Sequence, residues 1–276
     1  LGFQQVYSLL NQIDGVEYVY AMSRPGLAVV TVRFFVGEDR EDSLLKLYNK
    51  LNQSMDRVTP GIAGWIVKPI EIDDVPIVSA TLHSDAYDTH QLHRVAEEVV
   101  GKLQHVSDSA RITIHGGEPR TVHAYLDPER LAAYGLSTQE LLGALQVSNV
   151  QGSGGQFDQG NEAILVEAGP FIRTANELGK VMVGVLEDRP IYLRDVAEIV
   201  DGPAETTTYS RFSIGPAGEG VADGSPAVTI AVAKKKGSNA VWVAKEVQAV
   251  LAALHGSIIP DEVEVHITRD YGETAN

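Results

Sequence analysis

The histidines and methionines of this chain are the residues whose types suit metal binding. His90 and His93 stand three residues apart, which places both side chains on one face of a helix. A zinc site needs three or four ligands with supporting partners, and the sequence has no HExxH motif, no comparable triad and no cysteine. A copper site favours clustered soft ligands, whereas Met22, Met55 and Met182 are scattered. We predict no metal site and no cofactor.

Catalytic motifs are equally sparse. Nucleophilic hydrolysis favours a serine on a strand-to-helix turn such as GxSxG, and the sequence lacks this motif. Glu17, Glu118 and Glu162 are carboxylates suited to acid–base chemistry, but their spacing selects no pair. We therefore predict that the chain is not an enzyme and has no catalytic residue.

Two segments invite an anion-binding interpretation. The glycine-rich segment 152–155 lacks the Gly-Lys-Ser/Thr ending of a phosphate loop, since Gln156 and Phe157 follow it. We expect a loop over residues 152–160. The lysine run 234–236 precedes a helix N-terminus, where anion binding is an alternative, but a solvated turn between strand and helix is the simpler interpretation.

Composition limits the remaining classes. The 276 residues contain 22 basic and 37 acidic side chains, a net charge of −15, which argues against nucleic-acid binding and against adhesion to an anionic membrane. The length predicts two or three compact units. The densest apolar strip, 227–233, is far shorter than the ~18 residues of a membrane helix. The chain opens without methionine or a signal peptide, so we expect a fragment of a longer protein.

The hydrophobic periodicity predicts a repeated β-α-β-β-α-β unit, whose first copy lacks its first strand. The first part is expected to follow the order helix, strand, strand, helix, strand, over residues 1–12, 16–22, 27–36, 39–55 and 65–72. The second part is expected to follow the order strand, helix, strand, strand, strand, helix, strand, over 76–82, 89–103, 111–115, 206–214, 227–233, 240–254 and 263–267. Asp88 and Gln91 are spaced like a capping box at the start of the helix 89–103.

The stretch between these halves predicts an inserted module. We expect strands over 122–126, 163–167, 181–186 and 191–193, and helices after Asp127-Pro128 and after Ser137. Thr174 with Glu177 is expected to cap a short turn. The fold class is therefore α+β, with two ferredoxin-like split β-α-β subdomains and a small α+β subdomain inserted in the second. The expected boundaries are 1–74 for the first, whose first strand is missing, 75–120 with 206–276 for the second, and 121–205 for the insertion.

Several short strings occur in the same order as in a known family. They are GVEYVY at 15–20, SRPG at 23–26, GED at 37–39, DPERL at 127–131, YGLS at 134–137, RDVAEI at 194–199, GSNA at 237–240 and RDYGETAN at 269–276. Together with the strand 29–34, these strings resemble the first periplasmic loop of resistance–nodulation–cell-division (RND) efflux permeases. The resemblance spans nearly the whole chain.

The resemblance implies a fold of two porter subdomains with a docking subdomain inserted in the second. It implies a role in the export of drugs or other amphiphilic small molecules by a proton-driven transporter. The full-length protein is then expected in the inner membrane of a Gram-negative bacterium, with this part in the periplasm. The implied partners are two further copies of the protein in a trimer, a periplasmic adaptor (membrane fusion) protein and an outer-membrane channel. The proton-carrying membrane helices lie outside this sequence.

A promiscuous pocket is mostly apolar, so the sheet faces opposite the helices are candidates for substrate contact. From strand position we assign this role to Val30, Val32, Val78, Ile112, Ile114 and Tyr209. The alternative is that these side chains pack against the helices, because a shift of one residue reverses the face. The chain has only six phenylalanines, which favours lipid-like or other amphiphilic substrates over a polyaromatic drug pocket. The segment 148–160 is expected to be too short for a long arm that grips a neighbour.

Three other functions remain open. One is a stand-alone ligand-binding regulatory protein built of tandem ferredoxin-like domains. Another is an enzyme on the same fold that uses a carboxylate or a histidine. The third, within the transporter hypothesis, is a metal exporter.

Overall fold

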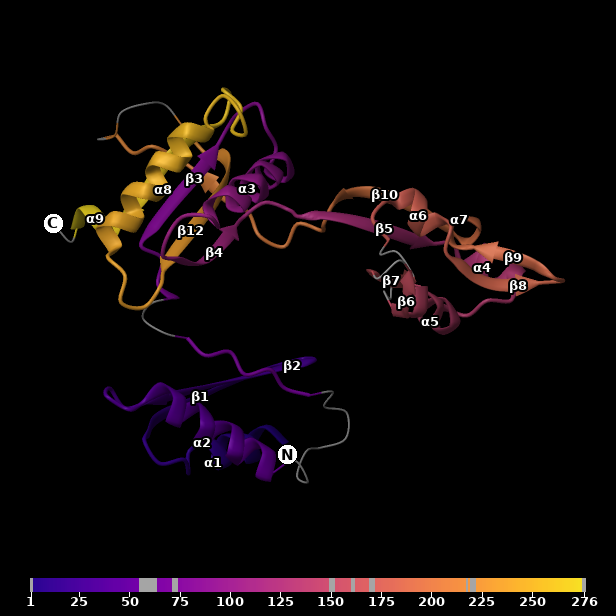
Figure 1. The fold of residues 1–276 in the computed structure, drawn as a ribbon, viewed down its shortest axis with the longest axis horizontal. Coiled ribbons are helices and arrows are strands. Elements are labelled where there is room, and N and C mark those ends of the chain that lie inside the picture. Colours follow the sequence, from indigo (N-terminus) through magenta and orange to yellow (C-terminus); the bar gives the residue numbers. More distant parts are fainter. Residues whose placement is uncertain are drawn as a thin grey trace. The chain divides into compact units, whose positions relative to one another are not determined.

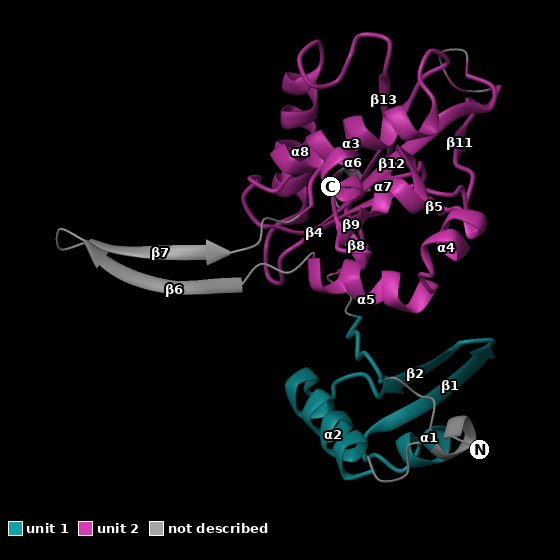
Figure 2. Ribbon diagram, turned by 90° about the vertical axis from the view of Figure 1, so that its right-hand side faces the viewer, with its two compact units in different colours: residues 1–71 teal, residues 72–276 magenta. Residues whose placement is uncertain are grey.

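The chain folds into two units, residues 1–71 and 72–276 (Figure 2). The computed structural model describes residues 2–54, 64–70, 74–148, 152–159, 162–168, 172–216, 218 and 222–274. The fold is α+β, with a split β-α-β arrangement in the second unit, a hairpin with two helices in the described part of the first, and a smaller α+β module inserted in the second. This is the fold class that the periodicity predicts.

In the part that the structure describes, unit 1 consists of two helices and a β-hairpin. Its elements are α1 (Gly2–Leu10), β1 (Val16–Arg24), β2 (Leu27–Phe34) and α2 (Arg40–Gln53). The strands pair antiparallel from Tyr18 with Arg33 to Arg24 with Leu27, and Gly26 turns the chain at φ +75°. Asp39 begins α2 by accepting a hydrogen bond from the backbone N–H of Asp42 at 2.9 Å.

The hydrophobic core of unit 1 is small. Leu10, Ile13, Val19 and Leu47 are its buried residues, each 4–9% exposed. The expected strand 65–72 is wrong where the structure describes it, because residues 64–70 form no strand. Unit 2 supplies the physical reason, since its last strand pairs with its first strand, and the described part of unit 1 contains no equivalent first strand.

Unit 2 is built on a sheet in which the strands β4, β12, β3 and β13 lie side by side in that order. Figure 1 labels β4, β12 and β3 of this sheet. The elements of this part are β3 (Val78–His83), α3 (Thr89–Leu103), β4 (Ser109–His115), β11 (Arg211–Phe212), β12 (Ser225–Lys234), α8 (Ala240–Leu254), β13 (Glu264–Asp270) and α9 (Tyr271–Thr274). All pairs are antiparallel, and β11 adds two residues to the end of β12. The expected strand 206–214 is thus limited to Arg211 and Phe212.

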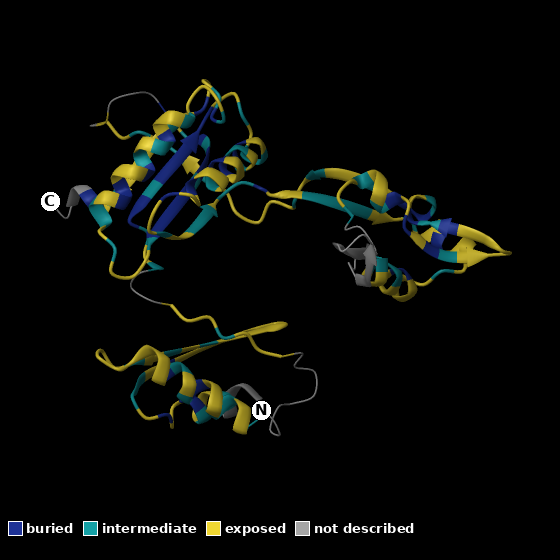
Figure 3. Ribbon diagram, viewed as in Figure 1, coloured by how far each residue is buried: buried dark blue, intermediate teal, exposed yellow. Residues whose placement is uncertain are grey.

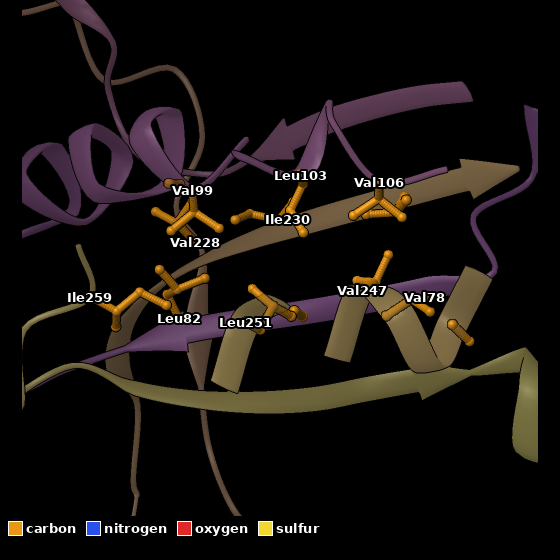
Figure 4. Packing of buried hydrophobic residues seen from close by; sticks show 14 of the residues in the cluster. Val78, Leu82, Val99, Leu103, Val106, Val228, Ile230, Val247, Leu251 and Ile259 are labelled. Carbon is orange, nitrogen blue, oxygen red and sulfur yellow. The ribbon is translucent and has the colours of Figure 1, made fainter. Parts of the chain in front are cut away.

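One face of this sheet carries both helices and holds the main core. Alternate side chains of β3 and β12, among them Leu82 and Ile230, are fully buried, as the dark strands in Figure 3 show. The strand side chains Val78, Leu82, Val228 and Ile230 pack with Val99 and Leu103 of α3 and Val247 and Leu251 of α8 (Figure 4). The spacing of three and four residues on each helix places these apolar side chains toward the sheet.

Polar side chains set the beginnings of both helices. Asp88 accepts from the backbone N–H of Gln91 at 2.7 Å, and the Gln91 side chain accepts from the Asp88 N–H at 3.0 Å. This confirms the predicted capping box. Asn239 caps α8 by accepting from the backbone N–H of Val241, so residues 234–236 precede a helix end that already has its own cap.

The inserted stretch begins and ends on a shared two-stranded ribbon. β5 (Arg120–Leu126) pairs antiparallel with β10 (Ala197–Pro203), so the two ends of the stretch are adjacent. Between them lie α4 (Pro128–Tyr134), α5 (Thr138–Ser148), β6 (Gly152–Gln159), β7 (Glu162–Ala168), α6 (Ala175–Gly179), β8 (Met182–Leu186), β9 (Arg189–Tyr192) and α7 (Leu193–Val196). β6 pairs with β7, which corrects the loop expected over 152–160.

This module has its own hydrophobic core. Its buried residues are Leu131, Leu141, Val181, Val183, Ile191, Leu193, Val196 and Ala197. A salt bridge between Arg120 and Asp201 joins the two strands of the ribbon. The Nε of Arg120 donates to one carboxylate oxygen of Asp201 at 2.8 Å, and a second guanidinium nitrogen donates to the other oxygen. This bidentate pair lowers the pKa of the Asp201 carboxyl. Separate cores agree with the boundaries expected from the sequence, but the three-part division remains a prediction.

Candidate functional site

The face of the β4-β12-β3-β13 sheet opposite α3 and α8 is the candidate site. Its side chains alternate with those of the core along each strand. On β3 and β12 it presents Ser79, Thr81, His83, Ala227, Thr229 and Ala231, and on β4 and β13 it presents Arg111, Thr113, His115, Glu264 and His266. We call this set the open face. Unlike the opposite side, it is polar and rich in threonine and histidine.

The centre of the open face is a threonine cluster. The hydroxyls of Thr81 and Thr229, which are cross-strand partners, lie 2.8 Å apart. Thr268 of β13 donates to the backbone carbonyl of Ser79 at 3.2 Å, and its oxygen lies 3.3 Å from that of Thr81. Each of these three threonine hydroxyls therefore has a hydrogen-bond partner. The centre of the open face is a surface of small, mutually bonded side chains and contains no activated nucleophile.

One end of the open face carries an aromatic group. His83 stacks on Phe212, with ring centroids 4.3 Å apart and an angle of 20° between the ring planes. His266 meets Phe212 at 5.1 Å and His83 at 6.2 Å. The short strand β11 is what places Phe212 here, since it pairs with the first residues of β12. Stacked rings of this kind give an apolar contact surface beside the threonine cluster.

A hollow of about 240 Å³ lies at the same end. It is lined by His83, Ser84, Asp85, Ala86, Ser225, Glu262 and Glu264. Burial lowers the pKa of His83, and the nearby Glu264 opposes this effect only in part. The hollow is therefore lined by acidic side chains and a histidine whose neutral form is favoured.

The six residues predicted to contact substrate lie elsewhere. Val78 is fully buried in the main core, and Ile112 and Ile114 pack against it. In unit 1, Val30 and Val32 pack against the core of that unit. These five thus lie on the faces that carry the helices, which is the alternative stated above. The reason is the period of two: the inward face of each strand is one residue away from the outward face.

Tyr209, the sixth, is 82% exposed and precedes β11. The structure brings Val78, Ile112 and Ile114 into one core but places the pair from unit 1 in a separate core. No observation tests whether any of the six contacts a substrate.

Thr81, His83 and Glu264 were missed by the sequence reasoning. The signal was present in β3, where polar Ser79, Thr81 and His83 alternate with Val78, Ala80 and Leu82. The expectation of a mostly apolar pocket selects the apolar set of the strand instead. The buried helix partners decide the face, and they become visible only in the tertiary structure.

Unit 1 also has a face opposite its helices. Tyr18, Tyr20 and Met22 on β1 and Leu27 and Val29 on β2 are exposed there, and the two tyrosine rings lie 6.0 Å apart. This aromatic and apolar face contrasts with the polar open face of unit 2.

Comparison with known proteins places the chain in a family. Residues 4–276 match the model of the AcrB/AcrD/AcrF family. The chain belongs to this family, which confirms the resemblance to RND efflux permeases. It is 25% identical over 267 residues to a multidrug resistance protein, MdtC, of Yersinia enterocolitica, and 24% identical over 267 residues to MdtC of Yersinia pseudotuberculosis.

The relatives are much longer than this chain. The matches cover 96% of the chain but only 25% of each MdtC protein. The crystal structure of a heavy metal efflux pump matches with a TM-score of 0.73 and 20% sequence identity, over 99% of this chain and 26% of that one. At this identity the likeness supports the fold alone.

The described residues lack two features. Within them, no helix is both long and apolar enough to cross a membrane. The same residues contain no group of three or more histidine, cysteine, aspartate or glutamate side chains placed to hold a metal ion.

Proposed function

We propose that this chain is the substrate-contacting and docking part of a proton-driven efflux transporter for amphiphilic small molecules. Family membership and the names of the MdtC relatives support the export role. The observation that carries the proposal is the open face of unit 2, a sheet surface that its own helices do not cover and that combines threonines, histidines and Phe212. Such a mixed surface suits substrates with both polar and apolar parts.

The partners follow from the same proposal. The full-length protein assembles as a trimer in the inner membrane of a Gram-negative bacterium, with this chain in the periplasm. An adaptor protein and an outer-membrane channel complete the export path. The inserted module, residues 121–205, is proposed as the docking subdomain, since it has a core of its own and ends that lie together on the β5-β10 ribbon. Residues 1–74 and 75–120 with 206–276 are the proposed porter subdomains.

Substrate contact is proposed for the open face and for Tyr209, which is exposed near Phe212 in sequence. Val30, Val32, Val78, Ile112 and Ile114 are proposed to act indirectly, by fixing the strands from the core side. An aliphatic core side chain keeps a strand in register but leaves its polar neighbours to meet the ligand.

Resistance profiling of cells that lack the full-length gene, with and without a plasmid copy, tests the proposal. Wild-type protein is expected to restore growth in amphiphilic toxic compounds. His115→Ala and His266→Ala, both exposed on the open face, are expected to change the order of compounds tolerated without lowering protein level. His105→Ala is the matched control, because that exposed histidine directly follows α3 on the helix-bearing side.

If the plasmid copy restores no resistance to any compound, the transporter proposal is wrong and the regulator alternative gains support. If both variants give the wild-type profile, the open face is not the contact surface.

A further inference from the structure

The hollow at the end of β3 combines three carboxylates with a buried ring. Asp85, Glu262 and Glu264 are among its seven lining residues, and these seven include neither lysine nor arginine. His83 belongs to the lining as well, and its side chain is only 5% exposed. The hollow thus has an acidic rim around a nearly buried imidazole. Most buried polar groups in proteins are hydrogen-bonded to their neighbours.

His83 is not satisfied in this way. Its Nε2 atom is buried and has no hydrogen-bond partner among the described residues. The nearest carboxylate oxygen, Oε2 of Glu264, lies 3.7 Å away, beyond hydrogen-bond reach. A buried nitrogen left without a partner destabilises the fold, so an unpaired group at the edge of a hollow is suited to a ligand that supplies the missing hydrogen bond.

The chemistry of that ligand follows from the charges. Burial lowers the pKa of His83, against the attraction of Glu264 and Asp85 and together with the repulsion of His266. Near neutral pH the ring is therefore uncharged. With its proton on Nδ1, the ring offers a lone pair at Nε2 and accepts a hydrogen bond. A ligand that donates hydrogen bonds and carries positive charge satisfies both Nε2 and the three carboxylates.

We propose that this hollow binds a protonated primary amine, whose ammonium group donates to His83 Nε2 and to the Glu264 carboxylate. A single nitrogen to one side of the line that joins these two acceptors can reach both at hydrogen-bond distance, because the acceptors are only 3.7 Å apart. Phe212, stacked on the same imidazole, offers an apolar surface beside the hollow for the rest of the molecule. A metal ion fits less well, since no suitable group of three ligands occurs in the described residues.

The inference rests on the proposed function only where it assigns the bound amine to the exported substrates. Binding itself is independent of export. The two claims therefore fail separately, and the experiment measures binding and resistance in parallel.

Saturation-transfer NMR on the purified full-length protein measures binding of small probes, including weak ones. The probe is 2-phenylethylammonium. Its neutral analogue 2-phenylethanol lacks the charge, and its trimethylated analogue keeps the charge but cannot donate a hydrogen bond. We expect the order primary ammonium, then trimethylammonium, then alcohol, with about a tenfold step where a charge-assisted hydrogen bond is lost.

Two variants remove the two acceptors separately. His83→Phe keeps a ring for stacking on Phe212 but removes both nitrogens, and Glu264→Gln keeps size while removing the charge. Each is expected to weaken binding of the primary ammonium roughly tenfold. Glu98→Gln makes the same charge change at an exposed site on α3, and is expected to bind like wild type.

Equal binding of the alcohol and the ammonium would overturn the site, as would wild-type affinity in both variants. Displacement of the bound ammonium by micromolar zinc would also overturn it in favour of a metal site. If the protein confers resistance but binds no ammonium probe, the transporter proposal stands and the amine site is wrong. If the protein binds the ammonium probe but confers no resistance, the amine site stands and the export proposal is wrong.

Discussion

The two units use the same order of elements but reach different degrees of completeness. In unit 2, β3, α3, β4, β12, α8 and β13 close a four-stranded sheet under two helices. In unit 1, α1, β1, β2 and α2 form a hairpin with two helices, and residues 64–70 stay outside the sheet. A split β-α-β fold therefore depends on pairing between its first and last strands, which are the most distant in sequence.

The hydrophobic core of unit 2 is also more deeply buried than that of unit 1. Among the described residues, the core of unit 2 contains eleven that are 0% exposed, whereas the four hydrophobic core residues of unit 1 range from 4% to 9%. A two-stranded hairpin is marginal by itself, because one small face buries little apolar area. Equivalent substitutions are therefore expected to cost more in unit 2.

The largest expected effect is the loss of a core leucine in unit 2. Leu82→Ala removes a fully buried side chain between α3, α8 and the sheet, and is expected to lower the free energy of unfolding by about 2–5 kcal/mol. Leu51→Ala in α2 is the matched control, with an expected cost near 1 kcal/mol, because Leu51 is only partly buried. Urea unfolding followed by circular dichroism measures both. Equal costs would remove the distinction between the two cores.

A glycine substitution sharpens the same comparison. Gly117 has φ +68°, and an added Cβ would lie 2.5 Å from the backbone oxygen of Thr89. Gly26 has a similar φ of +75°, but no described atom lies within 4 Å of an added Cβ. Gly117→Ala is expected to cost about 2–4 kcal/mol from strain plus collision, and Gly26→Ala about 1 kcal/mol from strain alone. Thermal unfolding of the two variants gives the difference, and a cheaper Gly117→Ala would contradict it.

Removal of a helix cap is expected to give a smaller difference in stability between the two units. Asp88 forms a reciprocal capping box with Gln91, whereas the Asp39 side chain accepts one hydrogen bond from the Asp42 N–H. Asp88→Ala is expected to cost about 1–2 kcal/mol and Asp39→Ala about 0.5–1 kcal/mol. Hydrogen exchange of the first-turn amides of α3 and α2 measures the fraying directly. Greater fraying of α2 would reverse the expected order.

The smallest effect is a pH dependence confined to unit 2. All eight histidines lie in unit 2, and burial lowers the pKa of His83 below its ordinary value of about 6.5. The unfolded chain therefore binds this proton more readily than the folded chain. The contribution of His83 to stability is full above about pH 6.5 and is lost as the pH falls toward the lowered folded pKa.

His83→Phe is expected to remove this part of the pH dependence and to leave stability at pH 8 almost unchanged or higher, since it removes an unpaired buried nitrogen. Unfolding curves between pH 5 and 8 measure the difference from wild type. His105→Ala, which changes an exposed histidine, serves as the control. An unchanged slope in His83→Phe would show that the buried ring does not contribute.

Local sequence signals determined most of the elements. The period of three and four residues predicted α3 and α8, the capping box at Asp88 was predicted from two residues, and the apolar strip 227–233 predicted β12. These patterns depend on neighbours within one helix turn or one strand, so the sequence contains them completely. The order of the elements, in turn, determined the α+β class with an inserted module.

Only the tertiary structure decided which face of each strand is inward. Val78 and Ser79 are adjacent in sequence, yet one is in the main core and the other belongs to the open face, because α3 and α8 cover one side of the sheet. The strand status of 64–70 and 206–214 was likewise decided by partners far away in the chain. Backbone hydrogen bonds of a strand are made with another segment, so a strand exists only where its partner is present.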